Sequence, residues 1–330
     1  MKNLTIAVDT MGGDLGAAAV VEGAWQAAIQ YKDQCVNLLL LGPEEQLKTE
    51  IEKCAAKYPK SPSPTLEIIH APEVILPNEV PTSVIKQKKD SSMVVGIRTL
   101  REGRADSFVS AGSTGALLTG VFTYVKRQPG IQRPALATLF PTPKGFTLLL
   151  DCGANAEVKP AYLAQFAQLG ADYMEKSLGI KNPRVGLINI GTEKEKGTPI
   201  YQEAHELLAE SGINFAGNIE GREVPTGAVD VAVCDGFVGN IVLKFMEGFA
   251  KTLLGMIKQE LMSSTLSKMG ALMSKGAFGK LKKRFDYREV GGAPFLGLNN
   301  LVVKAHGSSD ALAIKNAIRQ CIVYERKVQI

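Results

Sequence analysis

Small, hydroxyl and amide residues directly follow several apolar segments of this sequence, and residues of these types can bind an anion. Leu4–Val8 runs into DTMGGD, and Ser107–Ser110 runs into SAGSTGALL. Further along the chain, similar segments run into DCGAN, NIGTEKEKG, CDGFVGN and KAHGSSD. Glycine lets a ligand approach the backbone closely, and the unpaired N–H groups at the start of a helix attract negative charge. The pattern therefore predicts an anion-binding site built from several turns.

The apolar segments that precede these turns are short and partly β-branched, as in the strands of a buried parallel sheet. We expect strands at Leu4–Val8, Val36–Leu41, Leu66–Ile69, Ser107–Ser110, Thr147–Asp151, Val185–Ile190 and Asp230–Cys234. Helical patterns lie between them, for example over Ala161–Lys176, and Tyr58–Ser63 is predicted as a loop. The alternation predicts an α/β fold with three αβα layers, a mainly parallel sheet and a single domain over residues 1–330. Such sheets bind ligands at the carboxyl ends of their strands, where these turns lie.

The composition is that of a globular protein, because 45% of the 330 residues are hydrophobic and 22% are charged. The net charge of +5 is mild, so we expect no nucleic-acid partner, and an acidic partner would need a local basic cluster. The chain enters a predicted strand at once, and no apolar run reaches the ~20 residues that span a membrane. The five cysteines form no CxxC pair. We therefore expect a cytoplasmic protein with reduced thiols and without a metal site.

Several motifs of cofactor binding and catalysis are missing from the sequence. GxGxxG does not follow the first strand, and GxxxxGK[ST], GxSxG and HExxH are absent. We therefore expect no cofactor. Cys152 and Cys234 end predicted strands and could act as nucleophiles, but burial as small apolar side chains is the better interpretation, since neither has a histidine nearby in the sequence.

Two turns contain residues suited to the chemistry of an anion site. His306 lies in a glycine-containing turn beside Lys304 and shortly before Ser308, which favours a role in the site over a structural role. In the first turn, Gly12 and Gly13 allow close approach of a ligand, while Asp14 is either the N-cap of the next helix or part of the site.

The order of these motifs resembles that of the bacterial phosphate acyltransferases of phospholipid synthesis, the PlsX family. The matching segments are VDTMGGD, SAGSTGALL, RPALA, DCGAN, VGLINIGTE, VCDGFVGN, GGAPFLGLN and VVKAHGSSDALAIKNAI. The resemblance implies the fold of the phosphotransacetylases and isopropylmalate dehydrogenases, and the transfer of a fatty acyl chain from acyl carrier protein to inorganic phosphate. It also implies a homodimer with peripheral membrane association. Ser113 departs from the asparagine usual in the family, and Thr10 from alanine or valine.

Chemical roles can be assigned on the family's motifs as hypotheses. A thioester is already activated, so the protein must hold phosphate against the carbonyl carbon, stabilise the oxyanion and let the thiolate leave. We expect Lys304 to supply positive charge, His306 to donate a proton to the oxyanion or the leaving sulfur, and Asn155 to add a neutral donor. The expected substrate-binding residues are Gly12, Gly13, Asp14, Gly112, Ser113, Thr114, Gly115, Asp235, Asn240 and Ser308. Asp9 and Asp14 should orient donors and cap the helix, because a carboxylate in contact with phosphate dianion would repel it.

The segment 241–289 lies outside the strand–helix alternation and is predicted as a projecting amphipathic and basic helical segment. Its basic residues are Lys275, Lys280, Lys282, Lys283 and Arg284, with Arg288 beyond them. Three interpretations remain open: contact with anionic lipid, docking of the acidic acyl carrier protein, or an apolar dimer interface with solvated lysines.

The whole sequence is therefore interpreted as an acyltransferase that uses acyl carrier protein and phosphate. Two alternatives stay open. One is a short-chain phosphotransacetylase acting on acyl-coenzyme A, which would have similar anion-binding turns. The other is a non-catalytic module that binds a carrier protein or a lipid surface.

Overall fold

The computed structural model describes residues 3–59, 66–76 and 78–326. Most of the predicted loop at Tyr58–Ser63 lies outside these ranges. The contacts within the chain divide it into two compact units. The first unit comprises residues 1–138, 172–181 and 290–330, and the second comprises 139–171 and 182–289. Whether the two units act as the single predicted domain therefore stays a prediction.

The first unit is built on a mainly parallel sheet with the strand order β3-β2-β1-β4-β11-β10-β5. The strands are β1 (Leu4–Asp9), β2 (Val36–Gly42), β3 (Leu66–His70), β4 (Ser107–Ser110), β5 (Ala135–Thr142), β10 (Ala293–Leu296) and β11 (Leu301–Lys304). Residues 135–138 of β5 belong to this unit and residues 139–142 to the second. The pairs from β3 through β11 are parallel, and β10 is antiparallel to both of its neighbours. The carboxyl ends of β1, β4 and β11 therefore lie next to one another at one edge of the sheet.

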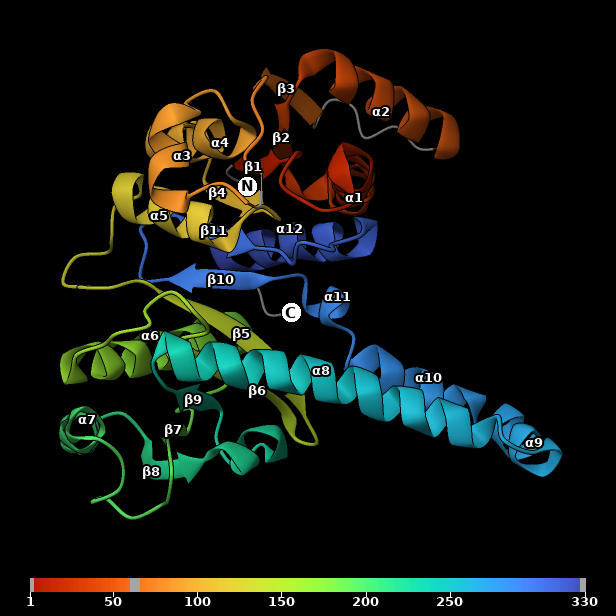
Figure 1. Ribbon diagram of the computed structural model, residues 1–330. Coiled ribbons are helices and arrows are strands. Elements are labelled where there is room, and N and C mark those ends of the chain that lie inside the picture. The colour runs from red at the N-terminus through yellow and green to blue at the C-terminus, as the bar shows by residue number, and fades with distance from the viewer. Residues whose placement is uncertain (1–2, 60–65, 77, 327–330) are drawn as a thin grey trace. The chain divides into compact units, whose positions relative to one another are not determined.

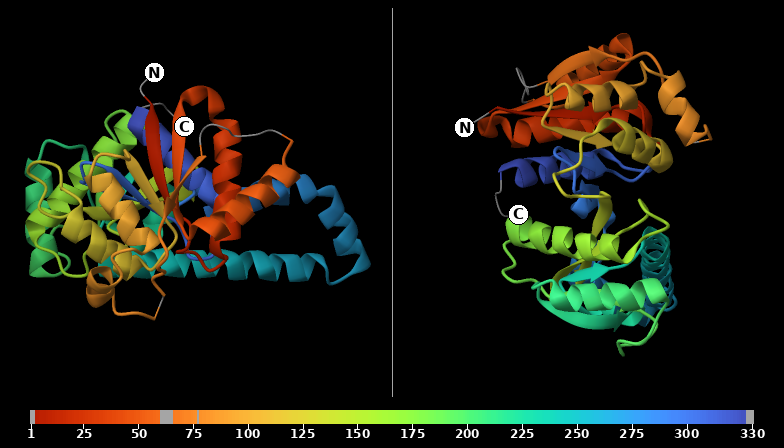
Figure 2. Two further views of the ribbon diagram at one scale, coloured as in Figure 1. Left: turned by 90° about the horizontal axis from the view of Figure 1, so that it is seen from above. Right: turned by 90° about the vertical axis from the view of Figure 1, so that its left-hand side faces the viewer.

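Helices cover both faces of this sheet (Figures 1 and 2). One group contains α1 (Gly16–Gln30), α2 (Glu44–Lys57) and α12 (Ala311–Arg326); the other contains α3 (Pro81–Gln87), α4 (Ser92–Arg101) and α5 (Thr114–Tyr124). The core between the first group and the sheet is aliphatic and includes Val8, Leu40 and Ile314, with Trp25. Gly23 allows α1 and α12 to approach closely, since a Cβ atom there would lie 2.6 Å from the Ala311 carbonyl oxygen. Burial of apolar side chains is the main force that holds these layers together.

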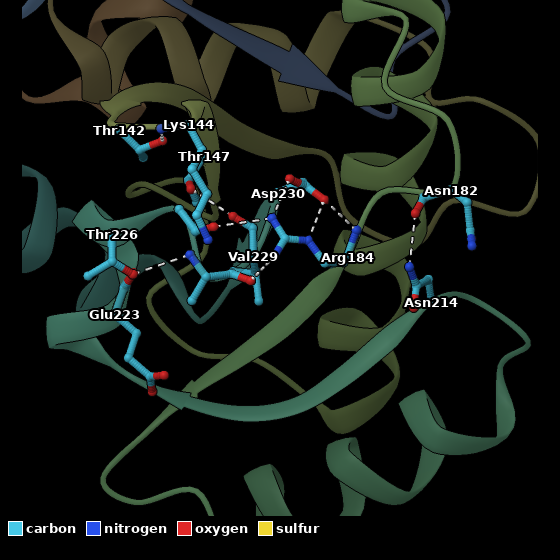
Figure 3. Close-up of polar contacts among 12 residues, drawn as sticks. Thr142, Lys144, Thr147, Asn182, Arg184, Asn214, Glu223, Thr226, Val229 and Asp230 are labelled. Atoms are coloured by element: carbon cyan, nitrogen blue, oxygen red, sulfur yellow. Dashed lines mark hydrogen bonds and ion pairs between the residues drawn. The ribbon is translucent and has the colours of Figure 1, made fainter.

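The second unit contains four parallel strands in the order β6-β9-β7-β8. They are β6 (Gly145–Leu150), β9 (Val231–Val233), β7 (Val185–Asn189) and β8 (Phe215–Glu220), accompanied by α7 (Pro199–Glu210) and by residues 160–171 of α6 (Pro160–Leu178). At the amino ends of β7 and β9, the Arg184 guanidinium donates hydrogen bonds to the Asp230 carboxylate at 2.9 and 3.1 Å and to the carbonyl oxygen of Ala228 at 2.5 Å (Figure 3). This ion pair lies at the edge of the sheet opposite to the carboxyl ends of the strands.

A helical segment completes the second unit. It consists of α8 (Gly236–Leu261), α9 (Thr265–Met273), α10 (Lys275–Arg284) and α11 (Tyr287–Val290). From its start next to β9, α8 runs past the strands of this unit to α9, and α10 leads back (Figure 1). Along α8, exposed apolar side chains recur every three or four residues, at Phe237, Ile241, Phe245, Phe249, Leu253 and Met256. Within the described part of the chain, no helix combines the length and apolarity needed to cross a membrane.

The observed elements confirm the predicted α/β fold with a mainly parallel sheet. Every predicted strand is present, with ends shifted by two residues at most. The predictions omitted β5, β8 and β10, which contain proline or glycine and lack a continuous apolar run. The antiparallel β10 has no counterpart in an alternation of parallel strands and helices, so that pattern could not predict it.

Candidate functional site

Three turns of the first unit come together at the carboxyl ends of neighbouring strands. Asp9 in β1 pairs in register with Ser110 in β4, and Ser110 pairs with Lys304 in β11. The turns that follow these three residues contain most of the predicted site: Gly12, Gly13 and Asp14; Gly112, Ser113, Thr114 and Gly115; and His306 and Ser308. The fold therefore brings residues from distant parts of the sequence to a single edge.

The glycines of these turns are needed because the backbones approach one another closely. A Cβ atom at Gly12 would lie 2.6 Å from the nitrogen of Gly112, closer than real Cβ contacts allow. The N–H of Asp14 donates a hydrogen bond of 2.8 Å to the carbonyl oxygen of Gly307. The first turn is thus tied to both of the others, as the role predicted for Gly12 and Gly13 requires.

The structure corrects the role predicted for Asp14 as a helix cap. Helix α1 begins at Gly16, and its N-cap residue is Leu15, whose side chain has no hydrogen-bonding group. The exposed Asp14 carboxylate instead lies beside the turn after β11, since a Cβ atom at Gly307 would be 3.0 Å from its Oδ2 atom. Gly16 has a φ of +66°, and the chain turns into the helix one residue later than a cap at Asp14 would need.

The turn after β4 presents the N-terminus of α5. Ser113 is the N-cap, and its hydroxyl accepts a hydrogen bond of 3.5 Å from the N–H of Ala116. Thr114 and Gly115 are the first two residues of the helix, so their N–H groups have no carbonyl partner within it. The missing asparagine at position 113 is thus replaced by a residue that still caps the helix. Together these N–H groups and the helix dipole favour an anion at this point.

Asp9 is almost fully buried, with 1% of its surface exposed, and lies beneath these turns. Its Oδ1 atom accepts hydrogen bonds from the Ser92 hydroxyl at 2.6 Å and the N–H of Met11 at 3.2 Å. Its Oδ2 atom accepts one from the Ser110 hydroxyl at 2.6 Å. Burial raises the pKa of Asp9, while hydrogen bonds from both hydroxyls and the backbone oppose that rise. These contacts agree with the prediction that Asp9 orients donors.

The third turn provides the basic and titratable side chains. Lys304 is half-buried at the end of β11, and its Nζ atom donates to the carbonyl oxygen of Ala305. The Nδ1 atom of His306 accepts a hydrogen bond from the N–H of Ser308 at 3.2 Å and lies 2.8 Å from its hydroxyl oxygen. Because Nδ1 is the acceptor, the ring proton of the neutral imidazole is on Nε2.

The second unit gathers the other predicted residues at the carboxyl ends of β6 and β9. Asn155 is buried; its backbone N–H and its side-chain amide both donate to Oδ2 of Asp151, at 2.6 and 2.8 Å. Its carbonyl oxygen accepts from the N–H of Gly236 at 2.8 Å. Asn240 lies beside the same turn, since a Cβ atom at Gly153 would be 3.6 Å from that of Asn240. The contacts of Asn155 hold two turns together, and its catalytic role stays a prediction.

Asp235 is the N-cap of α8 and is also held by a tyrosine. One carboxylate oxygen accepts from the N–H of Val238 at 2.8 Å, and the other accepts from the hydroxyl of Tyr201 at 2.6 Å. Burial, followed by the hydrogen bond to Asp235, raises the pKa of Tyr201, so this phenol stays protonated. A carboxylate engaged in this way orients the turn rather than offering a free negative charge.

The two cysteines considered as nucleophiles and the basic residues of α10 differ in their exposure to solvent. Cys152 and Cys234 are buried, which fits the interpretation as small apolar side chains, and burial raises the pKa of Cys234 well above its usual range. The basic residues Lys275, Lys280, Lys282, Lys283 and Arg284 are exposed along α10. Within the described ranges, no three His, Cys, Asp or Glu side chains are grouped as ligands for a metal ion.

Sequence reasoning did not identify Ser92, Ser110, Asp151 and Tyr201 as parts of these turns. Asp151 and Ser110 end strands within the quoted motifs DCGAN and SAGSTGALL, so their position was a usable signal. Ser92 lies on α4, outside the motifs, and Tyr201 lies on α7, shortly after NIGTEKEKG; only the fold brings them to Asp9 and Asp235.

Comparisons of the sequence with known proteins point to one family. A family model described as "Fatty acid synthesis protein" matches residues 4–327. A phosphate acyltransferase of Clostridium botulinum (strain Loch Maree / Type A3) is 48% identical over 326 residues, which cover 98% of this chain and 95% of that protein. One of Clostridium perfringens (strain SM101 / Type A) is 50% identical over 318 residues, 96% of this chain and 92% of that protein. Among solved structures, a phosphotransacetylase from Streptococcus pyogenes has a TM-score of 0.64 at 17% identity, covering 97% of this chain and 93% of that one, a likeness of fold.

Proposed function

The chain belongs to the family of fatty acid synthesis proteins that includes these clostridial phosphate acyltransferases, and from this membership we infer that it transfers a fatty acyl group to inorganic phosphate. It is therefore an acyltransferase. We further propose that the acyl donor is acyl carrier protein and that the product, an acyl phosphate, serves phospholipid synthesis.

The observation that carries this proposal is the junction of three turns at the ends of β1, β4 and β11. The N-terminus of α5, with Ser113 as its cap, offers backbone N–H groups to a phosphate dianion. Lys304 adds a positive charge at the neighbouring strand end. The carboxylate of Asp9 is buried and accepts hydrogen bonds from serine hydroxyls and a backbone N–H, so its oxygens are engaged beneath the turns and are not presented to the bound dianion.

The proposed reaction needs no covalent enzyme intermediate. An oxygen of hydrogen phosphate attacks the carbonyl carbon of the thioester, a C–O bond forms, and the C–S bond breaks. The electron pair of that bond leaves with the sulfur of the pantetheine arm, and the proton lost by phosphate replaces the acyl group on it. The products are acyl phosphate and the free thiol of the carrier protein. The protein contributes mainly the position of phosphate and charge stabilisation of the oxyanion.

His306 suits the role of donor in this reaction. With the proton on Nε2 and Nδ1 held by Ser308, its imidazole can donate to the oxyanion or pass a proton to the leaving sulfur. Ser308 then acts on the reaction through the orientation of His306. In the second unit, we propose that Asn155, Asp235 and Asn240 shape a substrate-binding turn, with Asp151 and Tyr201 as supports.

The helical segment suggests two further associations. The exposed apolar stripe on α8 supports packing against a second copy of the chain as a homodimer, because an isolated apolar stripe of this length is unfavourable in water. The exposed Leu266, Met269, Leu272 and Met273 of α9 lie next in sequence to the basic α10, which supports peripheral contact with an anionic membrane. The acidic carrier protein is the alternative partner for the lysines of α10.

A phosphate-dependent deacylation assay tests the proposed function. The protein is incubated with long-chain acyl carrier protein, with and without inorganic phosphate, and products are identified by mass spectrometry. Acyl phosphate formed only with phosphate supports the proposal. Turnover of acetyl-coenzyme A in place of the carrier-protein substrate would instead favour a short-chain phosphotransacetylase, and tight binding of carrier protein without product would favour a non-catalytic module.

A further inference from the structure

We propose that Asp9 is a positioning residue for the phosphate subsite, which it controls through Ser110 and the turn that begins α5. The inference rests on the proposed function, since it assumes that this turn holds the phosphate. It goes beyond the expectation that Asp9 orients donors, because it names the donor and the subsite that this buried carboxylate controls.

The directions of the hydrogen bonds carry the argument. A Ser110 hydroxyl has one proton, and at 2.6 Å from Oδ2 of Asp9 that proton points to the carboxylate. The lone pairs of the same oxygen are then free to accept, and the N–H of Gly112 donates to it at 3.1 Å. Both serine hydroxyls and the N–H of Met11 donate to the Asp9 carboxylate, which is the acceptor in each of these contacts. Asp9 therefore sets the orientation in which Ser110 can anchor Gly112.

A small displacement of Gly112 would also displace the backbone N–H groups that are proposed to bind the phosphate. It directly precedes the cap residue Ser113, and its backbone is already in close contact with Gly12. A Cβ atom at Gly112 would lie 2.6 Å from Cε of Met93, so the turn is enclosed on that side as well. If the N–H of Gly112 lost its acceptor, the turn would shift in a confined space and move the N–H groups of Thr114 and Gly115. Displacement of binding groups in this way lowers both the affinity for the ligand and the catalytic rate.

The other oxygen of Asp9 supplies a matched control. Oδ1 accepts from the Ser92 hydroxyl, also at 2.6 Å, at the start of α4. Both serines are buried and both bond to Asp9 at the same distance, so removing either hydroxyl should cost similar stability. Of these two hydroxyls, it is that of Ser110 that also accepts a hydrogen bond from the N–H of Gly112. If the role of Asp9 is purely structural, Ser110→Ala and Ser92→Ala should change the affinity for phosphate equally. If Asp9 is a positioning residue, the two substitutions should change that affinity by different amounts.

The experiment compares Asp9→Asn, Ser110→Ala and Ser92→Ala in the full chain. Unfolding in urea measures stability, steady-state kinetics measure KM for phosphate and for the acyl donor, and calorimetry measures binding of inorganic phosphate without turnover. We expect Ser110→Ala and Asp9→Asn to weaken phosphate binding about tenfold or more, with little change in KM for the acyl donor. Asp9→Asn acts in this way because its amide can donate to one serine and so reverses that hydrogen bond. Ser92→Ala should keep the phosphate affinity of the wild type.

Equal phosphate affinity in Ser110→Ala and Ser92→Ala would overturn the positioning role, even if the wild type forms acyl phosphate. Failure of the wild type to form acyl phosphate would overturn the proposed function instead. In that case the calorimetric comparison still decides whether Asp9 controls an anion site. If Asp9→Asn does not fold, the comparison of Ser110→Ala with Ser92→Ala still distinguishes the two roles, because both variants leave the carboxylate in place.

Discussion

The imidazole of His306 is held by Ser308 within one turn. Its Nδ1 atom accepts a hydrogen bond from the backbone N–H of Ser308 at 3.2 Å and lies 2.8 Å from the hydroxyl oxygen of Ser308. The contact holds the ring at a fixed angle and places the proton of the neutral imidazole on Nε2. The same turn is tied to the β1 turn by the hydrogen bond between Asp14 and Gly307, so the ring is attached to a supported loop and not to a free one.

Replacement of His306 by alanine should lower kcat about 100-fold or more, because a positioned proton donor typically contributes that much. His306→Gln places an amide N–H near the position of Nε2 and should retain more activity than His306→Asn, whose amide is near the position of Nδ1. The measurement is the rate of acyl phosphate formation at saturating substrates. Equal rates for the glutamine and asparagine variants would count against donation from Nε2, and wild-type rates for all three would remove His306 from the site.

Lys304→Gln should raise KM for phosphate about tenfold, since a charge-assisted hydrogen bond to an anion is lost. The effect should shrink as ionic strength rises, because salt screens the interaction that the variant removes. Lys53→Gln removes an equal charge from the exposed surface of α2 and is the matched control. A rise in KM that is the same for both variants would mean that only the overall charge of the protein matters.

Sequence patterns predicted those parts of the structure that depend on local chemistry. The apolar strands and the small residues after them are repeated signals, so the parallel sheet and the turns after β1, β4 and β11 were predictable. The buried partners of the site were not. Ser92 reaches Asp9 only because α4 packs against the sheet beside β1, and a contact across 83 residues of sequence has no local signal. Asp14 shows the converse: its residue type suits an N-cap, but the position of the turn decides where the helix begins.

The ion pair of Arg184 and Asp230 should make the second unit more stable at neutral pH than in acid (Figure 3). Burial alone would raise the pKa of Asp230, but hydrogen bonds and charge from Arg184 outweigh burial and hold that pKa below its usual range. Because the pKa is lower in the folded protein than in the unfolded chain, the carboxylate stabilises the fold above about pH 4. This contribution is lost as the pH falls through the lower, folded-state pKa.

Asp230→Asn should therefore reduce the free energy of unfolding by about 1 kcal/mol at pH 7, a modest value because the side chain of Arg184 is 40% exposed and solvent screens the pair. The difference from the wild type should narrow as the pH falls from about 4 through the lower, folded-state pKa of Asp230, because the wild-type carboxylate then becomes protonated as well. Urea unfolding at a series of pH values measures both effects. Glu45→Gln removes an exposed carboxylate that pairs with Lys48 and serves as the control. A difference between Asp230→Asn and the wild type that is constant down to pH 2 would contradict the role of the charge.

Phe245→Glu should convert the proposed homodimer into a monomer, because Phe245 is 67% exposed at the centre of the α8 stripe and a second copy would bury it. A carboxylate buried there without a partner costs several kcal/mol, which is enough to dissociate a dimer at micromolar concentration. Sedimentation equilibrium of the wild type and the variant measures the change. Lys251→Glu also introduces a negative charge on α8, but Lys251 follows Phe249 by two residues and so points away from the stripe. It should leave the dimer intact. A wild type that sediments as a monomer at tens of micromolar would remove the dimer from the proposal, whereas loss of the dimer in both variants would show that the interface depends on charge and not on the apolar stripe.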